Sequence, residues 1–292
     1  MLQTHRGLTA VGGSGIAERV SPPETSMLDV EFAHLSDCGR MREHNEDYLG
    51  YVVPATPAQV RTHGWLFALA DGVGGQGGGE VASRTAVERL LAGYRASAGG
   101  DLHTTLLPRL VQEANLRVYE TGRAASAGGV AMATTLVACG LRFDRAVVTH
   151  VGDSRCYLIR RGHAKLLTRD HTVAGEHMRL GLLSAQEAAE APTRHLLTRS
   201  LGSELFVNAE TSDHQVLAGD VLLLCCDGLH GAVQASEMAH AVSHGGDLNA
   251  AGQKLVALAN QRDGSDNISV LLIRVRSVER VGMYRGRPYR LR

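Results

Sequence analysis

The order of the short apolar runs is the feature that most limits the folds open to this chain. These runs are rich in β-branched and aliphatic residues and end at turn residues, which is typical of buried strands. They lie at residues 28–36, 65–70, 134–141, 145–152, 156–160, 164–168, 221–226 and 267–275. Several follow one another without an intervening helix. The sequence therefore predicts an α+β fold with antiparallel sheets, and not a doubly wound parallel sheet.

Helical periodicity appears in a few longer stretches, which we expect to pack outside the sheets. The predicted helices cover residues 80–94, 104–122, 184–191 and 249–261. Pro108 is expected in the first turn of the second of these helices, where a missing N–H is tolerated. Ser184 and Glu187 have the spacing of a capping box and mark the start of the third.

The chain is predicted to hold one domain, residues 29–276, between two tails. Residues 1–28 combine Gly, Ser, Thr and Pro without periodicity and are expected to be a flexible leader. Residues 277–292 hold five Arg against one Glu. We interpret them as a basic, solvated tail; the alternative is a docking arm for an acidic partner.

Composition excludes several classes of partner. Lys and Arg together number 30, as do Asp and Glu, so no overall field attracts nucleic acid or an anionic membrane. The five cysteines form no C-x-x-C pair, which favours reduced thiols in the cytoplasm. No apolar stretch has the length of a membrane span, and the N-terminus has no signal-peptide pattern. We expect a cytoplasmic monomer that binds neither membranes nor nucleic acid.

Acidic residues stand at the ends of the predicted strands. Asp71, Asp153 and Asp227 each follow an apolar run, and Asp266 stands where one begins. An Asp-Gly pair after such a run is by itself typical of a turn. In antiparallel sheets, however, the end of one strand lies beside the start of the next, so these carboxylates can gather at one edge. They would repel each other there unless a cation neutralised them, and oxygen ligands suit Mg²⁺ or Mn²⁺.

The glycines of residues 72–77 also fit the G-x-G-x-x-G pattern that cradles a dinucleotide pyrophosphate. The Asp71 carboxylate directly before them would face that pyrophosphate, which is unfavourable. No second strand ending in a ribose-binding acid follows either. We therefore reject a dinucleotide-binding oxidoreductase. The glycines are better explained by close packing and by a backbone carbonyl that faces a metal.

Several motifs in a fixed order extend this interpretation. They are SDCGRMREHNED (36–47), LADGVGG (69–75), MATTLV (132–137), VGDSRCYLIRRG (151–162), LTRDH (167–171), LLTRSLG (196–202), CCDGL (225–229) and SDNISVLL (265–272). Together they resemble the metal-dependent type 2C serine/threonine protein phosphatases, in particular their short bacterial members, over about residues 30–275. The resemblance implies a four-layer α-β-β-α sandwich, with two mainly antiparallel sheets flanked by helices. It also implies a mobile flap at about residues 172–207.

The resemblance also implies a set of metal ligands. Asp71, Asp227 and Asp266 match the ligands of one ion. Glu46, Asp71 and the carbonyl of Gly72 match the surroundings of a second, with Asp71 bridging the two. Two Mg²⁺ or Mn²⁺ ions in this arrangement would activate a shared water for in-line attack on phosphorus. No nucleophilic side chain is then required.

Further residues match other parts of the family's site. Asp153 matches the acid that helps to hold a third, weaker ion in bacterial members. Arg42 matches the arginine that grips the substrate phosphate, for which its planar fork of donors is well suited. Asp47 and Asn267 match supporting positions.

One position departs from the animal members of the family. Val73 stands where they have a histidine that acts as general acid, so the leaving-group proton must come from elsewhere. Metal-bound water and His171 are the two candidates, and we interpret His171 as structural. A zinc site at His240 and His244, which have i, i+4 spacing, lacks a third ligand and is rejected.

The predicted function is metal-dependent hydrolysis of phosphoserine and phosphothreonine in proteins. Its expected partners are a bacterial serine/threonine kinase and the targets of that kinase, whose signalling it would reverse. The alternative is a regulatory pseudophosphatase that binds phosphoproteins without turnover. The presence of the acidic residues and of Arg42 argues against that alternative.

Overall fold

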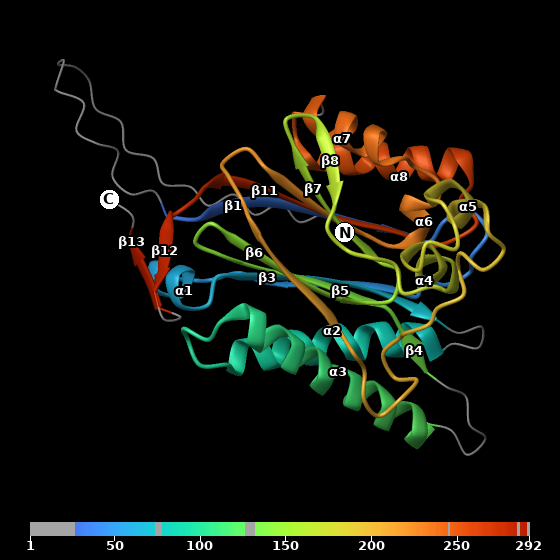
Figure 1. Cartoon of the computed structure of the whole chain (residues 1–292), viewed down its shortest axis with the longest axis horizontal. Helices are drawn as coiled ribbons and strands as arrows, with labels where there is room; N and C mark the ends of the chain where they lie inside the picture. The colour runs from blue at the N-terminus through green and yellow to red at the C-terminus, as the bar shows by residue number, and fades with distance from the viewer. Residues whose placement is uncertain (1–26, 74–77, 126–131, 245, 285–286, 291–292) are drawn as a thin grey trace.

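The computed structural model describes residues 27–73, 78–125, 132–244, 246–284 and 287–290. Within these residues two antiparallel sheets stack face to face, and helices cover both outer faces (Figure 1). The predicted α-β-β-α sandwich is thus confirmed. No helix among these residues has the length and apolar character needed to cross a bilayer.

The first sheet contains five strands. Their spatial order is β1 (Asp29–Asp37), β11 (Ile268–Ser277), β10 (Val221–Cys225), β7 (Arg155–Arg160) and β8 (His163–Leu166). All neighbouring pairs in it are antiparallel. The strand that follows the N-terminal segment therefore lies beside one of the last strands in the chain.

The second sheet is also antiparallel. Its order is β2 (Asp47–Val52), β3 (Trp65–Val73), β5 (Leu136–Arg142), β6 (Arg145–Val151) and β9 (Glu210–Gln215), and the short β4 (Ala133–Thr134) pairs with the end of β3. A separate two-stranded sheet joins β12 (Val281–Tyr284) to β13 (Arg287–Arg290).

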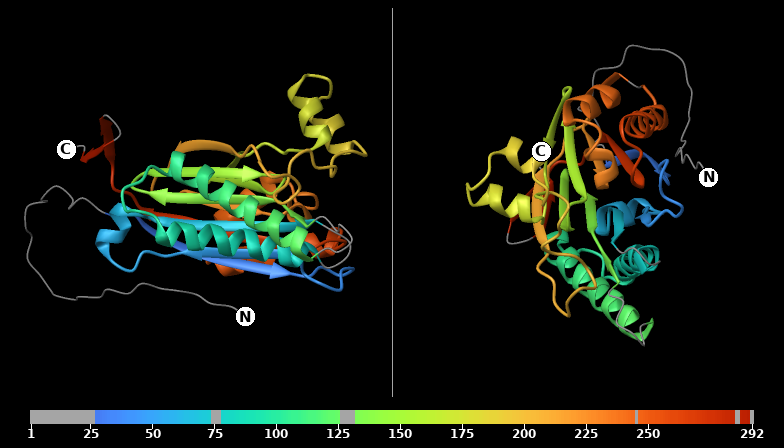
Figure 2. Two further views of the ribbon diagram at one scale, coloured as in Figure 1. Left: turned by 90° about the horizontal axis from the view of Figure 1, so that it is seen from below. Right: turned by 90° about the vertical axis from the view of Figure 1, so that its right-hand side faces the viewer.

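Two pairs of helices form the outer layers. The second sheet is covered by α2 (Gly78–Ala96) and α3 (His103–Ala125), and the first by α7 (Ala235–His244) and α8 (Leu248–Arg262) (Figures 1 and 2). The shorter helices are α1 (Pro57–Thr62), α4 (Val173–Arg179), α5 (Ala185–Glu190) and α6 (Asp227–His230). Of these, α4 and α5 stand out from one end of the sandwich (Figure 2).

Strand β3 shows how the core dictates the layers. Leu66 and Ala68 point to the helices α2 and α3, whereas Phe67 and Leu69 point to the other sheet, and all four side chains are buried. A strand that is buried on both faces has a continuous run of apolar residues, which is why the sequence predicted it.

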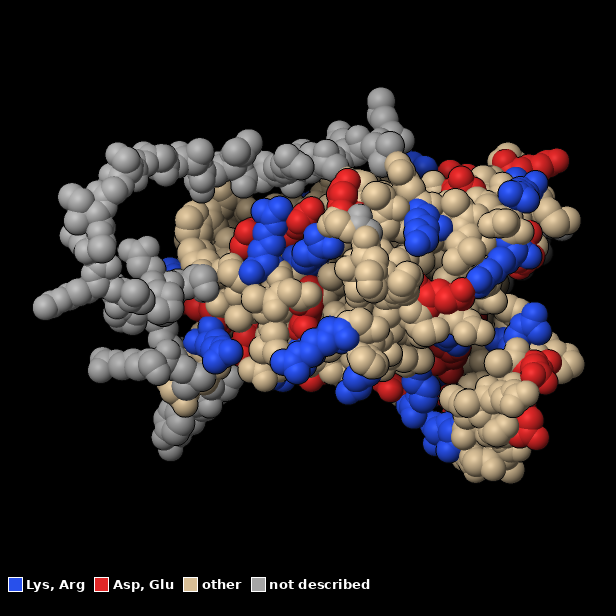
Figure 3. Space-filling model, turned by 90° about the horizontal axis from the view of Figure 1, so that it is seen from above, with Lys and Arg blue, Asp and Glu red and all other residues tan. Residues whose placement is uncertain are grey.

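On the outer face of the first sheet, charges of both signs are interspersed over α7 and α8 (Figure 3).

The predicted elements are found, with two corrections. Pro108 lies in the second turn of α3 and not in its first, because the helix begins at His103. Residues 277–292 are not a plain solvated tail, since they include β12 and β13, and Glu279 is buried beside Arg61 at 2.9 Å. Residues 1–26 of the predicted leader lie outside the described residues.

Candidate metal centre and active site

A polar cavity of about 300 Å³ lies at the end of the sandwich where β3 and β10 terminate. It is lined by Arg42, Glu46, Asp71, Gly72, Val73, Thr135, Asp153, His195, Leu197, Asp227 and Asp266. These include every predicted site residue except Asp47 and Asn267, which contact residues of the lining. The two sheets both contribute, since Asp71 comes from the second sheet and Asp227 and Asp266 flank strands of the first.

The backbone fixes Asp71 at the end of β3. Its N–H donates to the Thr135 hydroxyl at 3.0 Å, and its carbonyl accepts from the Thr135 N–H at 2.8 Å. Across the sheet, Asp71 lies opposite Asp47 on β2. The sheet register thus places two carboxylates side by side, which no local turn requires.

Gly72 is needed where the chain passes close to α2. A Cβ atom there would lie 2.3 Å from the carbonyl oxygen of Gly79, so no larger residue fits without a backbone shift. The Gly72 N–H donates to the Glu46 carbonyl at 3.1 Å. The close-packing explanation for this glycine is therefore confirmed. Residues 74–77 of the glycine segment lie outside the described residues.

Arg42 and Asp266 form an ion pair at the mouth of the cavity. The Arg42 Nη2 donates to Asp266 Oδ2 at 2.8 Å, and the arginine side chain is about half exposed, at 47%. The other oxygen, Asp266 Oδ1, accepts from the Asn267 N–H at 2.8 Å. Arg42 therefore lies within reach of both the Asp266 carboxylate and solvent.

Asn267 ties the loop that carries Arg42 and Glu46 to the start of β11. Its Oδ1 accepts from the Glu46 N–H at 2.8 Å. Its Nδ2 donates to the carbonyls of Cys38 and His44, both at 3.0 Å. This side chain is buried, and its three bonds explain how a residue behind the cavity can position others that line it.

The carboxylates are crowded and incompletely bonded. Among the residues that the structure describes, neither oxygen of buried Asp47 has a hydrogen-bond partner, and neither does Oδ1 of Asp227. Burial raises the pKa of Asp47 to about 7. Burial, followed by the charges of Asp47 and Asp227, raises the pKa of Asp71 well above its ordinary value. Burial and the charge of Asp227 likewise raise the pKa of Asp153 to about 7.

Asp227 behaves differently from its neighbours. Burial opposes its charge, but a hydrogen bond from His195 and the nearby histidines outweigh burial and lower its pKa. The His195 Nδ1 lies 3.5 Å from Asp227 Oδ2. Buried carboxylates whose charges repel one another form a cluster that a cation would stabilise. Hard oxygen donors with free lone pairs fit a divalent ion such as Mg²⁺ or Mn²⁺.

The structure adds one titratable wall residue that the sequence analysis did not predict. His195, with a side chain 55% exposed, lines the cavity on the flap side, whereas Val73 stands near the glycines without a titratable group. No local pattern signals His195, because its place depends on the folding of the flap. His171, the sequence candidate for general acid, is fully buried and does not line the cavity; its Nδ1 accepts from the Gly152 N–H at 3.2 Å.

Other clusters of possible ligands are less suited to a cation. His150, His171 and Glu210 come close together, but Arg169 bonds Glu210 at 2.6 Å and Arg199 approaches His171 at 3.3 Å. Two guanidinium groups disfavour a metal ion at that place. His240 and His244 stack on each other and, within the described residues, join no third ligand.

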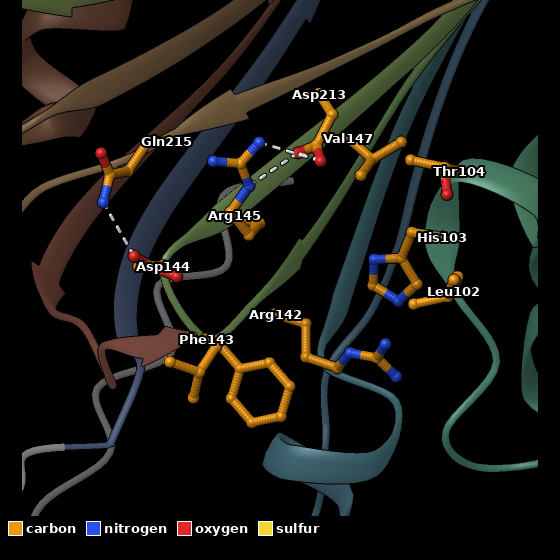
Figure 4. Close-up of a pocket in the computed structure, with 11 residues that line it drawn as sticks. Leu102, His103, Thr104, Arg142, Phe143, Asp144, Arg145, Val147, Asp213 and Gln215 are labelled. Atoms are coloured by element: carbon orange, nitrogen blue, oxygen red, sulfur yellow. Dashed lines mark hydrogen bonds and ion pairs between the residues drawn. The ribbon is translucent and has the colours of Figure 1, made fainter. Parts of the chain in front are cut away.

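A larger cavity, of about 490 Å³, lies at the opposite end of β5 and β6 (Figure 4). Its polar residues bond one another: Arg145 pairs with Asp213, and Gln215 donates to Asp144. Both carboxylates that line this cavity are thus engaged, although Oδ1 of Asp144 has no hydrogen-bond partner among the described residues, and they do not cluster as the acids of the first cavity do. We therefore assign the chemistry to the carboxylate cavity.

Fold and cavity together define a class, the phosphatases that are built as an α-β-β-α sandwich with a carboxylate-lined metal centre. The family model for protein phosphatase 2C matches residues 39–270, and the chain belongs to this family. It is a phosphoprotein phosphatase.

Named relatives agree with this assignment. The serine/threonine phosphatase stp of Listeria welshimeri is 34% identical over 86% of this chain and 96% of its own length. Protein phosphatase PhpP of Streptococcus pneumoniae is 30% identical over 84% of this chain and 97% of its own length. These relatives favour an enzyme over a non-catalytic pseudophosphatase.

Solved structures give the same result. The serine/threonine phosphatase of S. agalactiae superposes with a TM-score of 0.77 and 31% identity, covering 85% of this chain and all of that one. The catalytic domain of the phosphatase PstP, solved with two manganese ions, gives 0.74 and 29% identity over 86% of this chain and all of that one.

Proposed function

We propose that the protein uses two divalent ions, Mg²⁺ or Mn²⁺, to hydrolyse phosphoserine and phosphothreonine in proteins. Asp71, Asp227 and Asp266 would hold one ion, and Glu46, Asp71 and the Gly72 carbonyl would surround the second. The observation that carries the proposal is the convergence of these residues on one cavity, beside buried carboxylate oxygens that have no hydrogen-bond partner in the described part of the chain.

A third, weaker ion would bind beside Asp153. This residue lines the same cavity as Asp227 and is 5% exposed, so its charge also needs compensation. The metal used in the cell would be either Mg²⁺ or Mn²⁺, since both accept carboxylate and carbonyl oxygens.

When bound, the ions would supply Lewis-acid activation of water and of the phosphoryl group. The protein's own residues would orient the substrate. Arg42 would exchange its bond to Asp266 for the phosphate oxygens and hold them with two parallel donors. Asn267 would keep the Arg42 loop in place, and Asp47 would support Asp71 from the neighbouring strand.

The substrates would be phosphorylated proteins, including a serine/threonine kinase and the targets of that kinase. We further propose a cytoplasmic monomer; the balance of 30 Lys and Arg against 30 Asp and Glu supports the expectation that it binds neither nucleic acid nor membrane. The relatives named above are serine/threonine phosphatases, which supports this substrate class.

Hydrolysis of a phosphothreonine peptide tests the proposal. We expect activity with Mn²⁺, none with EDTA, and a loss of at least about a hundredfold for Asp227→Asn, because a hard ligand is lost. Asp213→Asn, which removes an acid of an exposed ion pair far from the cavity, is the matched control and should keep its activity. Full activity in EDTA, or wild-type activity of Asp227→Asn, would contradict the proposal.

A further inference from the structure

A second cavity continues from the carboxylate cavity beneath the flap helices. Its volume is about 460 Å³, and Asp153 and His195 line both cavities. One wall comes from α4 and α5, and the other from residues of β7, β8 and the loop that follows β8. A substrate whose phosphate lies at the carboxylates would therefore extend past an adjoining space in the same surface.

The flap side of this second cavity is made of small and apolar side chains. Helix α5 contributes Ala185, Ala188 and Ala189, and α4 contributes Ala174 and Met178. Alanine at three positions of one short helix leaves the space open, because longer side chains there would fill it. The apolar Leu166 lines the same cavity from β8.

Apart from Asp153, the charged side chains on the opposite wall form ion pairs within the protein. Arg155 bonds Asp170 through two contacts, at 2.9 and 2.6 Å, and the Nη2 of Arg169 bonds Glu210 at 2.6 Å, whereas the Nε of Arg169 has no hydrogen-bond partner among the described residues. Away from Asp153 and that Nε, a polar side chain that enters this space would give up water without gaining a free charged partner, which is costly. An apolar side chain would only lose contact with water, which is favourable.

His230 completes this wall. Its Nε2 lies 3.0 Å from the Asp153 carbonyl, so this ring nitrogen is already bonded within the protein. A bonded ring nitrogen supplies no free partner for an incoming side chain. At the rim the exposed Arg194 donates to His195 at 2.8 Å.

We propose that this cavity binds one apolar side chain of the phosphoprotein substrate, a few residues from the phosphorylated Ser or Thr. Three features favour this occupant: the lining that the two cavities share at Asp153 and His195, the alanines of α5, and the paired charges opposite them. The proposal rests on the phosphatase function proposed above and names the sequence feature that this site selects.

Phosphothreonine peptides with a single leucine, placed in turn at each position near the phosphothreonine in an otherwise polar sequence, test the proposal. We expect one position at which leucine raises kcat/KM about tenfold over serine, since burial of an aliphatic side chain supplies a factor of this order. Equal rates at every position, or a preference for acidic or polar residues, would overturn it.

Filling the cavity should abolish the preference. Ala189→Trp and Ala185→Trp both add bulk at exposed helix positions that line the cavity, so neither needs the core to repack. The ratio of kcat/KM for the best leucine peptide to its serine counterpart should fall to about one in these variants. A ratio that stays at the wild-type value in both folded variants contradicts the proposal.

Gln186→Trp is the matched control. Gln186 is exposed on the same helix but does not line the cavity, and its variant should keep the wild-type ratio. Hydrolysis of p-nitrophenyl phosphate with Mn²⁺ by the wild type separates the two proposals. If that reaction fails, the proposed function is wrong; if it proceeds and the peptide preference is absent, only the cavity assignment is wrong.

Discussion

At the scale of single residues, the acids that we propose as metal ligands differ in place from the residue that we propose to position their neighbours. Asp71, Asp227 and Asp266 line the cavity, while Asn267 stands behind it and holds three backbone groups of another loop. Asn267 is as buried as the core residues, so its replacement should lower both the stability and the activity of the protein.

Replacing Asn267 by Ala tests this positioning role. The change leaves the Glu46 N–H and two carbonyls without their partner, which costs about 1–3 kcal/mol of unfolding free energy. Urea unfolding in EDTA, where no metal contributes, measures the change. A loss below about 0.5 kcal/mol would show that these bonds do not hold the loop.

A histidine far from the cavity should make the stability of the protein depend on pH. His103, at the start of α3, is 5% exposed, and its Nε2 lies 2.8 Å from the His63 carbonyl. Burial, aided by the charge of Arg142, lowers the pKa of His103 to about 4 from 6.5. The unfolded chain therefore binds a proton first as pH falls. The stability that this histidine contributes is complete above pH 6.5 and is lost as pH falls toward 4.

His103→Gln isolates this effect, since glutamine can still donate to the His63 carbonyl but does not titrate. The wild type should lose about 2 kcal/mol more unfolding free energy than the variant between pH 7 and pH 5. Urea unfolding at the two pH values measures the difference. Equal losses in both proteins would mean that His103 takes up its proton in the folded state as easily as in the unfolded one.

At the scale of elements, the flap helix α5 depends on its cap. Ser184 accepts from the Glu187 N–H at 3.2 Å, and the Glu187 carboxylate accepts from the Ser184 N–H at 2.8 Å, which completes the predicted capping box. A helix of this length has little stability of its own. The cap should therefore decide how often α5 opens.

Ser184→Ala should destabilise α5 by about 1 kcal/mol. Amide exchange at residues 185–190 should accelerate about fivefold, because local opening becomes more frequent. The melting temperature of the whole protein should change little, since α5 lies outside the sandwich core. Hydrogen-exchange mass spectrometry reads both regions in one experiment. Unchanged exchange in α5 would refute the role of the cap.

The strands also show how far the sequence could predict the fold. Strands buried on both faces, such as β3 and β10, are continuous apolar runs and were predicted from the sequence. The edge strand β9 is polar along its length, and β2 is partly exposed, so neither stands out from a loop. Their places follow from pairing with β6 and β3, which is long-range information.

At the candidate site too, some residues could be predicted from local sequence and others could not. Asp71 and Asp227 were found because each ends an apolar run, a signal that lies within a few residues. His195 was not found, because it reaches the cavity only through the path of the flap. The pairing of Arg42 with Asp266 likewise joins positions separated by 224 residues. Local patterns predict such residues singly, and only the fold brings them together.

At the scale of the whole molecule, the candidate metal centre joins the two sheets at one end of the sandwich. Asp71 belongs to the second sheet, whereas Asp227 and Asp266 flank strands of the first. Ions held between them would bind the folded protein and not the unfolded chain. Binding would therefore stabilise the sandwich by about 2.7 kcal/mol at a free concentration a hundredfold above Kd.

Calorimetric titration of the metal-free protein with Mn²⁺ measures directly how many ions bind and how tightly. The account predicts at least two ions bound to the wild type, and both strongly weakened in Asp71→Asn, since Asp71 is the ligand that the two would share. Circular dichroism of the variant should remain that of the wild type. Undiminished Mn²⁺ binding by a folded Asp71→Asn, or no binding by the wild type, would contradict the account.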